Sequence, residues 1–310
     1  MQREGHLWVI VLAAGDGTRV AALTTDTRGE HVPKQYFTFG ERESMLQWAL
    51  ARALSLVPAS RVIVIVADKH RPHWEPVLAA LPAANVIVQP QNRGTAAGVL
   101  LPFLEVFLRR DPRAHFLILP ADHFVAHEEV LRRAMAVAAR AAAPPGRPVV
   151  LLGMTPEEPD PEYGWILPSA GPSASLRPVA SFVEKPERAV AAELAARGGL
   201  INSFVIAASS SAFLRLYGAT IPGLLQTFLG VLRAGGNVPE LYERIATDDF
   251  SRDVLTHATH SLAVLPVPAC GWSDLGTPAR IERHAALRRQ EPLRAAARWP
   301  RPGSARHITP

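Results

Sequence analysis

The sequence predicts an α/β protein with a largely parallel sheet covered by helices on both faces. In the first half of the chain, short apolar runs rich in β-branched residues alternate with amphipathic helical patterns. The chain has 310 residues, 48% of them hydrophobic, which is enough for one large core or two modest ones. A glycine-rich turn, Gly15-Asp16-Gly17, follows the first apolar run directly. Such a turn is typical of the sheet edge where α/β proteins bind ligands.

The first half has the spacing of repeated strand–helix–strand units. Because parallel strands end at the same edge, the glycine turn and the string "PADH" (120–123) are expected to lie side by side. Strands are predicted over 8–13, 61–67, 85–89 and 115–120, and helices over 44–56, 71–81, 95–110 and 127–142.

The second half reads as a smaller, β-rich lid fused to the same sheet. Pro144, Pro145 and Gly146 break the first pattern, which divides the domain into halves of about 1–146 and about 147–290. No internal repeats are found. The expected elements are a strand over 147–154, a helix over 187–197, a strand over 200–208, helical segments to about residue 246 and a last strand over 261–267.

Composition and charge exclude several functional classes. No 18-residue apolar span and no signal-peptide pattern is present, which predicts a cytoplasmic protein without membrane partners. The single cysteine, Cys270, is expected to be a small buried hydrophobic residue in a reducing compartment. The net charge of +5 is spread along the chain, and residues 291–310 read as a flexible basic tail. Without interleaved aromatic residues, this charge does not predict nucleic-acid binding.

Charged residues at the predicted ligand edge indicate phosphate chemistry. Free backbone amides at the glycine turn, with Arg19 beside them, suit an anion. Asp122 and Asp274 each follow a strand, and two carboxylates at such an edge suit Mg²⁺ that shares its ligands with substrate phosphates. Two structural alternatives stay open: Asp122 as a helix cap, and Asp274 in a turn with Gly276.

Lysine is used sparingly. Of 33 basic residues, 30 are arginines and only Lys34, Lys69 and Lys185 are lysines. Lys34 and Lys185 lie in the motif-like strings "VPKQY" and "FVEKP", which favours a chemical role for a compact point charge.

The ordered strings "LAAGDGTR … PKQ … QPQNRGTA … PADH … YGW … FVEKP … INSF … GWSDLG" resemble the nucleoside-diphosphate-sugar pyrophosphorylases, most closely their mannose-1-phosphate guanylyltransferase branch. The resemblance covers about residues 8–290. It implies a Rossmann-like, glycosyltransferase-A-like fold with a mixed, mostly parallel sheet and a small β-rich sugar-binding lid. It also implies transfer of a nucleotidyl group from an NTP to a sugar 1-phosphate, with Mg²⁺ and release of pyrophosphate.

The same resemblance assigns roles to residues of this chain. Arg19, Lys34 and Lys185 would be catalytic, and Asp122 and Asp274 would hold the metal. Lys185 would also grip the sugar phosphate, together with the sugar-binding residues Gly164, Glu184 and Asn202. The nucleotide would be bound by Ala13, Ala14, Gly15, Gly17, Thr18, Gln89, Gly94 and Thr95.

Several positions leave alternatives open. Gln89 stands where the branch often has glutamate; glutamine offers one acceptor and one donor, so it matches uracil or thymine as well as guanine. Ile201 replaces a usual tryptophan, which suggests a more open sugar pocket. Adjacent Glu184 and Lys185 reach one ligand only if the chain twists at Pro186; otherwise Glu184 faces solvent.

Three further interpretations concern two single residues and one segment. Asn202 has the alternative role of capping a strand end, and His123 is expected to cap the following helix rather than to act in catalysis. Residues 20–32 suggest a mobile flap with Arg28 as an extra phosphate contact.

The sequence therefore predicts a sugar-1-phosphate nucleotidyltransferase, with GTP and mannose 1-phosphate as the favoured substrates and a homodimer as a possible assembly. The alternatives are a uridylyl- or thymidylyltransferase acting on glucose 1-phosphate, a cytidylyltransferase acting on an alcohol phosphate, and a catalytically silent homologue that binds nucleotide sugars and regulates a partner.

Overall fold

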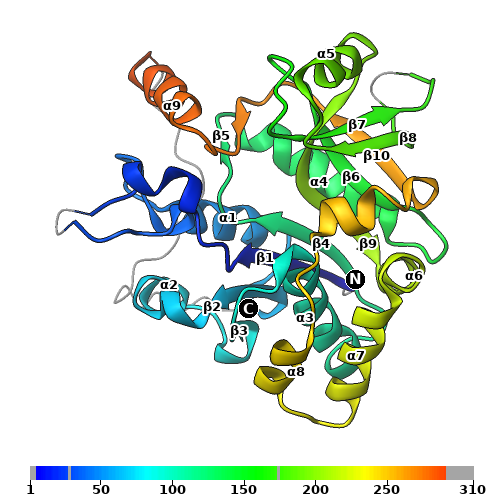
Figure 1. Cartoon of the computed structure of the whole chain (residues 1–310). Helices are drawn as coiled ribbons and strands as arrows, with labels where there is room; N and C mark the ends of the chain where they lie inside the picture. The colour runs from blue at the N-terminus through cyan, green and yellow to red at the C-terminus, as the bar shows by residue number, and fades with distance from the viewer. Residues whose placement is uncertain (1–4, 27–28, 173–174, 291–310) are drawn as a thin grey trace.

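A computed structural model describes residues 5–26, 29–172 and 175–290 (Figure 1). The predicted basic tail (291–310) and Arg28 lie outside the described residues. Within this part of the chain, one sheet of nine strands dominates, and a two-stranded sheet of β5 (Phe124–Val125) and β11 (Trp272–Ser273) lies apart from it. The strands of the large sheet are β1 (Leu7–Ala13), β2 (Val62–Ala67), β3 (Val86–Gln89), β4 (His115–Pro120), β6 (Val149–Met154), β7 (Gly164–Pro168), β8 (Arg177–Glu184), β9 (Leu200–Ser209) and β10 (Leu262–Val267).

The order of the large sheet is β3-β2-β1-β4-β9-β6-β10-β8-β7. The first four strands are parallel to one another, and β6 and β10 form another parallel pair. Strand β9 enters antiparallel between β4 and β6, and β7 and β8 are antiparallel at the far edge. The predicted mixed α/β class is confirmed, and each antiparallel pair includes at least one strand from the second half of the chain.

Helices cover both faces of the sheet (Figure 1). One face packs against α3, α6, α7 and α8, and the other against α1, α2, α4 and α5. The helices are α1 (Met45–Leu54), α2 (Arg71–Leu78), α3 (Gly94–Arg109), α4 (Glu128–Ala142), α5 (Arg188–Ala196), α6 (Ser210–Thr220), α7 (Pro222–Arg233), α8 (Val238–Arg244) and α9 (Pro278–Gln290).

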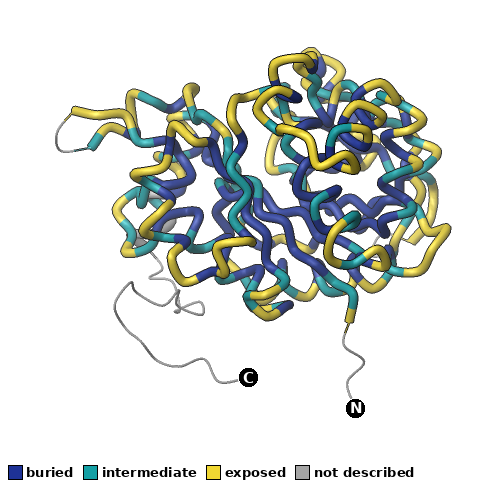
Figure 2. Tube along the Cα trace, turned by 90° about the horizontal axis from the view of Figure 1, so that it is seen from below, coloured by how far each residue is buried: buried dark blue, intermediate teal, exposed yellow. Residues whose placement is uncertain are grey.

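Two hydrophobic cores lie on either side of the sheet, because successive strand side chains point to opposite faces. In β1, Ile10 belongs to the core beneath α3, whereas Val9 and Val11 belong to the core beneath α1 and α4. All three side chains are fully buried. Figure 2 shows the central strands as a continuous buried band inside a more exposed shell.

Local sequence explains where α1 begins and where α4 ends. Ser44 accepts a hydrogen bond from the amide of Gln47, whose side chain accepts one from the amide of Ser44, and this capping box starts α1. Pro144 and Gly146 follow α4, where the break between the halves was predicted. Helix α9 and the two-residue strands β5 and β11 were not predicted, because such short or weakly amphipathic stretches carry no clear periodicity.

Cys270 is buried, as predicted, and burial raises the pKa of its thiol to about 11. No helix among the described residues combines the length and apolar character that a bilayer crossing requires.

Candidate active site

The ends of neighbouring strands bring the predicted ligand residues to one edge of the sheet. Leu12 at the end of β1 lies opposite Pro120 of β4, and its carbonyl accepts a hydrogen bond of 3.0 Å from the amide of Ala121. The glycine turn therefore starts beside Asp122, as the sequence predicted.

The "PKQ" string fixes the shape of the glycine turn. Gln35 Nε2 donates to the carbonyls of Ala13 and Gly15, at 3.0 and 2.7 Å, and the hydroxyl of Tyr36 donates to the same Ala13 carbonyl at 2.9 Å. Gly17 adopts a left-handed conformation with φ of 64°. A Cβ at Gly17 would lie 2.7 Å from the backbone nitrogen of Lys34, so only glycine fits against this lysine.

A pocket of about 290 Å³ opens over this turn and collects residues from five parts of the chain. Arg19, at the start of the short helix η1 (Thr18–Leu23), is held at the rim by an exposed ion pair with Glu162 at 3.3 Å. Exposed pairs of this kind are weak, so the guanidinium is available to a phosphate. The lining residues are Asp16, Gly17, Thr18, Arg19, Val20, Lys34, Asn92, Asp122 and Gly276.

The predicted metal residues meet at Lys34. Its buried ammonium lies 2.6 Å from Asp122 Oδ2 and donates to the backbone carbonyl of Asp274 at 2.5 Å. Burial, the largest single influence, raises the pKa of Asp122. The charge of Lys34, the neighbouring His123 and the hydrogen bonds to the carboxylate together outweigh burial and leave that pKa below its usual range. Asp122 is therefore a carboxylate at neutral pH.

Three donors orient the Asp274 side chain. Its Oδ1 accepts hydrogen bonds from the hydroxyl of Tyr163 at 3.0 Å, from the amide of Gly276 at 3.0 Å and from Arg280 Nη1 at 2.8 Å. The turn with Gly276 considered as an alternative is thus present. All three bonds use Oδ1, so the turn does not exclude a metal ligand role for Oδ2.

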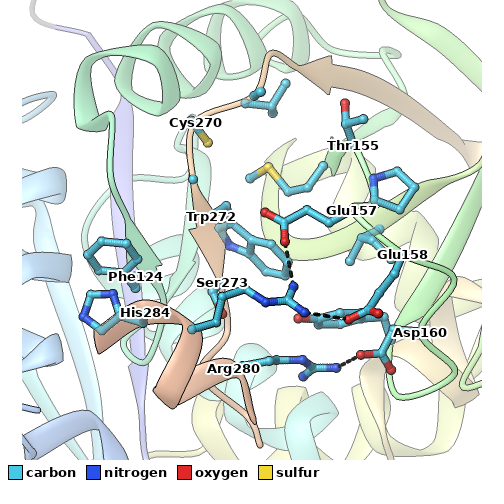
Figure 3. A pocket seen from close by; sticks show the side chains of 18 of the residues that line it. Phe124, Thr155, Glu157, Glu158, Asp160, Cys270, Trp272, Ser273, Arg280 and His284 are labelled. Atoms are coloured by element: carbon cyan, nitrogen blue, oxygen red, sulfur yellow. Dashed lines mark hydrogen bonds and ion pairs between the residues drawn. The ribbon is translucent and has the colours of Figure 1, made fainter. Parts of the chain in front are cut away.

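Arg280 is a component of the site that sequence reasoning missed. Its guanidinium also pairs with Asp160 (Figure 3). It lies 4.0 Å from the ring centroid of Tyr163. One turn further along α9, Arg283 pairs with Glu157 and Glu158. These contacts attach α9 to the loop that precedes β7 and frame a cavity of about 210 Å³ beside the site.

The donor set fits a divalent cation that is completed by substrate. Among the described residues no group of three or more His, Cys, Asp or Glu side chains could hold a metal. The carboxylate of Asp122, paired with Lys34, and that of Asp274, whose backbone carbonyl accepts from the same lysine, would supply only part of a coordination shell. Mg²⁺ commonly takes its other ligands from water and phosphates.

The predicted sugar residues also come together. A Cβ added at Gly164 would lie 2.5 Å from Glu184 Oε2 and 3.5 Å from Asn202 Cβ, so the three positions adjoin. Glu184 is partly buried rather than fully exposed. Burial, followed by the nearby charge of Asp249, raises its pKa to about 7.

Asn202 does not cap a strand end, the alternative considered for it, because it lies within β9; it has a different structural role inside this strand. Its Oδ1 accepts a hydrogen bond of 3.1 Å from the amide of Phe204, which has a positive φ of 56°. Because this bond uses Oδ1, the role does not exclude contact between the amide group and a sugar.

Lys185 lies immediately after β8, exposed, with a φ of 46°. Its amide donates to the carbonyl of Tyr163 at 3.1 Å. The sequence placed the required twist at Pro186, but the left-handed residue is Lys185 itself. This twist breaks the strand alternation that would otherwise send Glu184 and Lys185 to opposite faces.

The predicted base-reading residue Gln89 is buried at the end of β3. A Cβ at Gly98 in α3 would lie 3.5 Å from its Oε1. This oxygen has no hydrogen-bond partner within the described part of the chain. A buried acceptor without a partner is costly, so a ligand that donates to it would relieve that cost.

Residues 248–250 bond to the first residues of α3, a contact that the sequence did not predict. Thr95 Oγ1 donates to Asp249 Oδ2 at 3.2 Å and accepts from the amide of Phe250 at 2.7 Å. The Asp248 carbonyl accepts from the amide of Ala96 at 3.1 Å and occupies the place of a Cβ at Gly94. The only available signal was the acidic pair in the string "TDDF".

His123 does not cap the following helix, because α4 begins at Glu128. Its Nδ1 instead accepts a hydrogen bond of 3.2 Å from the indole of Trp272. Burial lowers its pKa to about 4, so the imidazole is neutral at physiological pH.

The predicted flap is attached to the glycine turn. A bridge joins Thr25 to His31, and the ring of His31 lies 3.3 Å from the carbonyl oxygen of Asp16. The remaining site residue, Ala14, is half-buried between β1 and the glycines.

Comparison with known proteins assigns the chain to a family. In solved structures, the fold is similar to that of the mannose-1-phosphate geranyltransferase from Thermus thermophilus, with a TM-score of 0.76 and 28% identity over 88% of this chain and 77% of that one. A family model described as nucleotidyl transferase matches residues 8–290, and the chain belongs to this family.

Curated relatives are similar over most of this chain. The xanthan biosynthesis protein XanB of Xanthomonas campestris pv. campestris (strain B100) is 31% identical, and a mannose-1-phosphate guanylyltransferase of Salmonella muenchen is 29% identical; each match covers 86% of this chain. The chain spans 57% of the length of each of these two relatives.

Proposed function

We propose that this chain transfers a nucleotidyl group from an NTP to a sugar 1-phosphate, giving a nucleotide sugar and pyrophosphate. The observation that carries the proposal is the meeting of Asp122 and Asp274 at Lys34 in the wall of the pocket at the glycine turn, in a fold that also brings Gly164, Glu184 and Asn202 together. Family membership and the names of the relatives support it.

The reaction forms a bond between the sugar-phosphate oxygen and the α-phosphorus and breaks the bond from that phosphorus to the β-phosphate oxygen. No general base is needed, since the attacking phosphate oxygen is already anionic. Catalysis then depends on alignment and on neutralising charge. Amides of Gly15 and Gly17 and the hydroxyl of Thr18 hold the triphosphate, Arg19 takes the leaving pyrophosphate, and Lys34 and Lys185 neutralise charge on the reacting phosphates.

Asp122 and Asp274 would hold Mg²⁺, which would neutralise phosphate charge at the reacting centre. Glu184 and Asn202 would bond sugar hydroxyls, and Gly164 leaves room for the ring. The nucleotide side corresponds to about residues 1–146 and the sugar side to about 147–290. The proposed reaction and the buried thiol suit the cytoplasm, and a homodimer remains a prediction that light scattering can test.

GTP and mannose 1-phosphate are the proposed substrates, with Gln89 and Gly94 at the base. A specific observation favours a second candidate: the unpaired oxygen of Gln89 can accept from uracil or thymine as well as from guanine. A uridylyl- or thymidylyltransferase acting on glucose 1-phosphate is therefore the alternative.

Pyrophosphate release tests the proposal. Purified protein with Mg²⁺ is assayed with GTP, UTP, dTTP, CTP and ATP, each paired with mannose 1-phosphate and with glucose 1-phosphate. Release with GTP and mannose 1-phosphate alone is the expected result. Pyrophosphate release with UTP or dTTP would show that the enzyme selects uracil or thymine, as in the alternative. No release with any pair would favour the catalytically silent regulatory homologue.

A matched pair of variants separates chemistry from folding. Asp122→Asn is expected to lower the rate by about 10²–10³-fold or more, because a charge is lost where phosphate charge develops. Asp68→Asn removes an equal charge from an exposed position that pairs with Arg71, and it should retain the rate. Equal rates in the two variants would refute the assignment.

A further inference from the structure

A second groove lies on the opposite edge of the sheet from the glycine turn. It has a volume of about 690 Å³ and surrounds the start of the parallel strands β6 and β10, where Val149 and Leu262 are paired. The carboxyl ends of the same strands lead toward the proposed active site. None of the residues assigned to that site lines this groove, so the groove is a separate feature.

The groove brings together basic residues from separate segments. Arg140 comes from the last turn of α4, Arg147 from the connection to β6, Arg177 from the start of β8 and Arg215 from α6. His260 lies beside the start of β10. Within the described residues, no aspartate or glutamate lines the groove.

These four arginines differ from most others in the described chain. Arginines such as Arg52, Arg132 and Arg280 pair with carboxylates. None of the four groove arginines forms an ion pair within the residues that the structure describes. Arg177 also has a buried Nε that finds no hydrogen-bond partner among the described residues. This N–H group has lost its contact with water without gaining a protein acceptor, which costs free energy.

We propose that this groove is a second anion site that binds a small oligophosphate. Converging arginines without countercharge concentrate positive potential in a concave site, and their planar guanidinium groups suit phosphate oxygens. The volume lies in the range of small-molecule sites.

Two kinds of ligand carry the oligophosphate group that the groove arginines would bind. Inorganic tripolyphosphate carries the charge alone, whereas a nucleoside triphosphate adds a base. An apolar wall for a base is present, because Leu176, Pro178 and Leu262 also line the groove. This proposal does not depend on the proposed reaction.

Calorimetric titration of the full chain with tripolyphosphate in EDTA tests the proposal, since removing Mg²⁺ weakens binding at the metal-assisted site. One bound anion per chain is expected. Arg147→Ala/Arg215→Ala should weaken binding by about tenfold for each arginine, or about 1.4 kcal/mol each. Arg19→Ala, at the glycine turn, should leave this binding unchanged.

The control double variant Arg113→Ala/Arg233→Ala removes the same charge from exposed positions elsewhere and should bind like the wild type. Absence of binding, equal losses in the two double variants, or loss with Arg19→Ala alone would each overturn the proposal. A parallel titration with GTP identifies the source: tighter binding than tripolyphosphate, lost in the groove variant, indicates a nucleotide, and equal binding indicates the phosphate chain.

Discussion

Replacing Arg280 by glutamine should destabilise the fold through two carboxylates at once. Arg280 is 9% exposed, and its guanidinium bonds Asp274 at 2.8 Å, pairs with Asp160 and lies over the ring of Tyr163. Removing one partner of a buried ion pair costs about 3–5 kcal/mol. The Asp160 and Asp274 side chains keep 20% and 15% exposure, so we expect the low end, about 3 kcal/mol. In a domain of this size that lowers Tm by roughly 5 °C.

Urea denaturation measures this loss, and Arg283→Gln is the matched control. Arg283 lies one turn along the same helix and is half exposed in its pairs with Glu157 and Glu158, so its loss should cost less than about 1 kcal/mol. A double-mutant cycle of Arg280→Gln with Asp160→Asn should give a coupling of about 1–2 kcal/mol. Equal losses in the two arginine variants, or a coupling near zero, would refute the reasoning.

Three further predictions concern other parts of the site. Gly17→Ala should lower both stability and pyrophosphate release more than Gly40→Ala, since both positions have positive φ but only the first would place a methyl against backbone; equal effects in the two assays would contradict this. The pKa of Glu184, about 7 against an ordinary 4.5, makes the folded state hold the proton more tightly, so the free energy of unfolding should fall as pH rises between these values. Glu184→Gln should flatten this fall in denaturation curves and Glu243→Gln should not, and a fall that persists in the first variant would count against the assignment. Cys270, buried and with its pKa raised to about 11, should react with iodoacetamide at pH 8 only after unfolding, and rapid labelling of the native protein would disprove its burial.

The strands that were predicted could be recognised because they are short apolar runs in which neighbouring residues are buried on opposite faces. Val62–Ala67, for example, is buried at every position, and only a strand covered on both sides needs such a run. The strand-end position of Asp122 was predictable for the same reason, since the rule that ligands bind beyond parallel strands requires no knowledge of side chains.

The contacts that complete the site were not predictable from local pattern. Arg280 meets Asp160 across 120 positions and Thr95 meets Asp249 across 154, and nothing in either local sequence names the partner. Helix α9 gave no amphipathic signal, so its return to the loop before β7 could not be foreseen. The twist at Lys185 was misplaced by one residue because a positive φ is rare outside glycine.

The position of Lys34 has a consequence for how a metal would be used. Carboxylates gathered for a cation repel one another when the cation leaves, and in many small metal-binding domains folding then depends on the metal. Here the chain carries its own counter-ion, tethered at 2.6 Å from Asp122. The fold should therefore tolerate a chelator with little change in Tm, and a metal ion held as proposed by Asp122 and Asp274 would bind and leave with the nucleotide without being needed for folding.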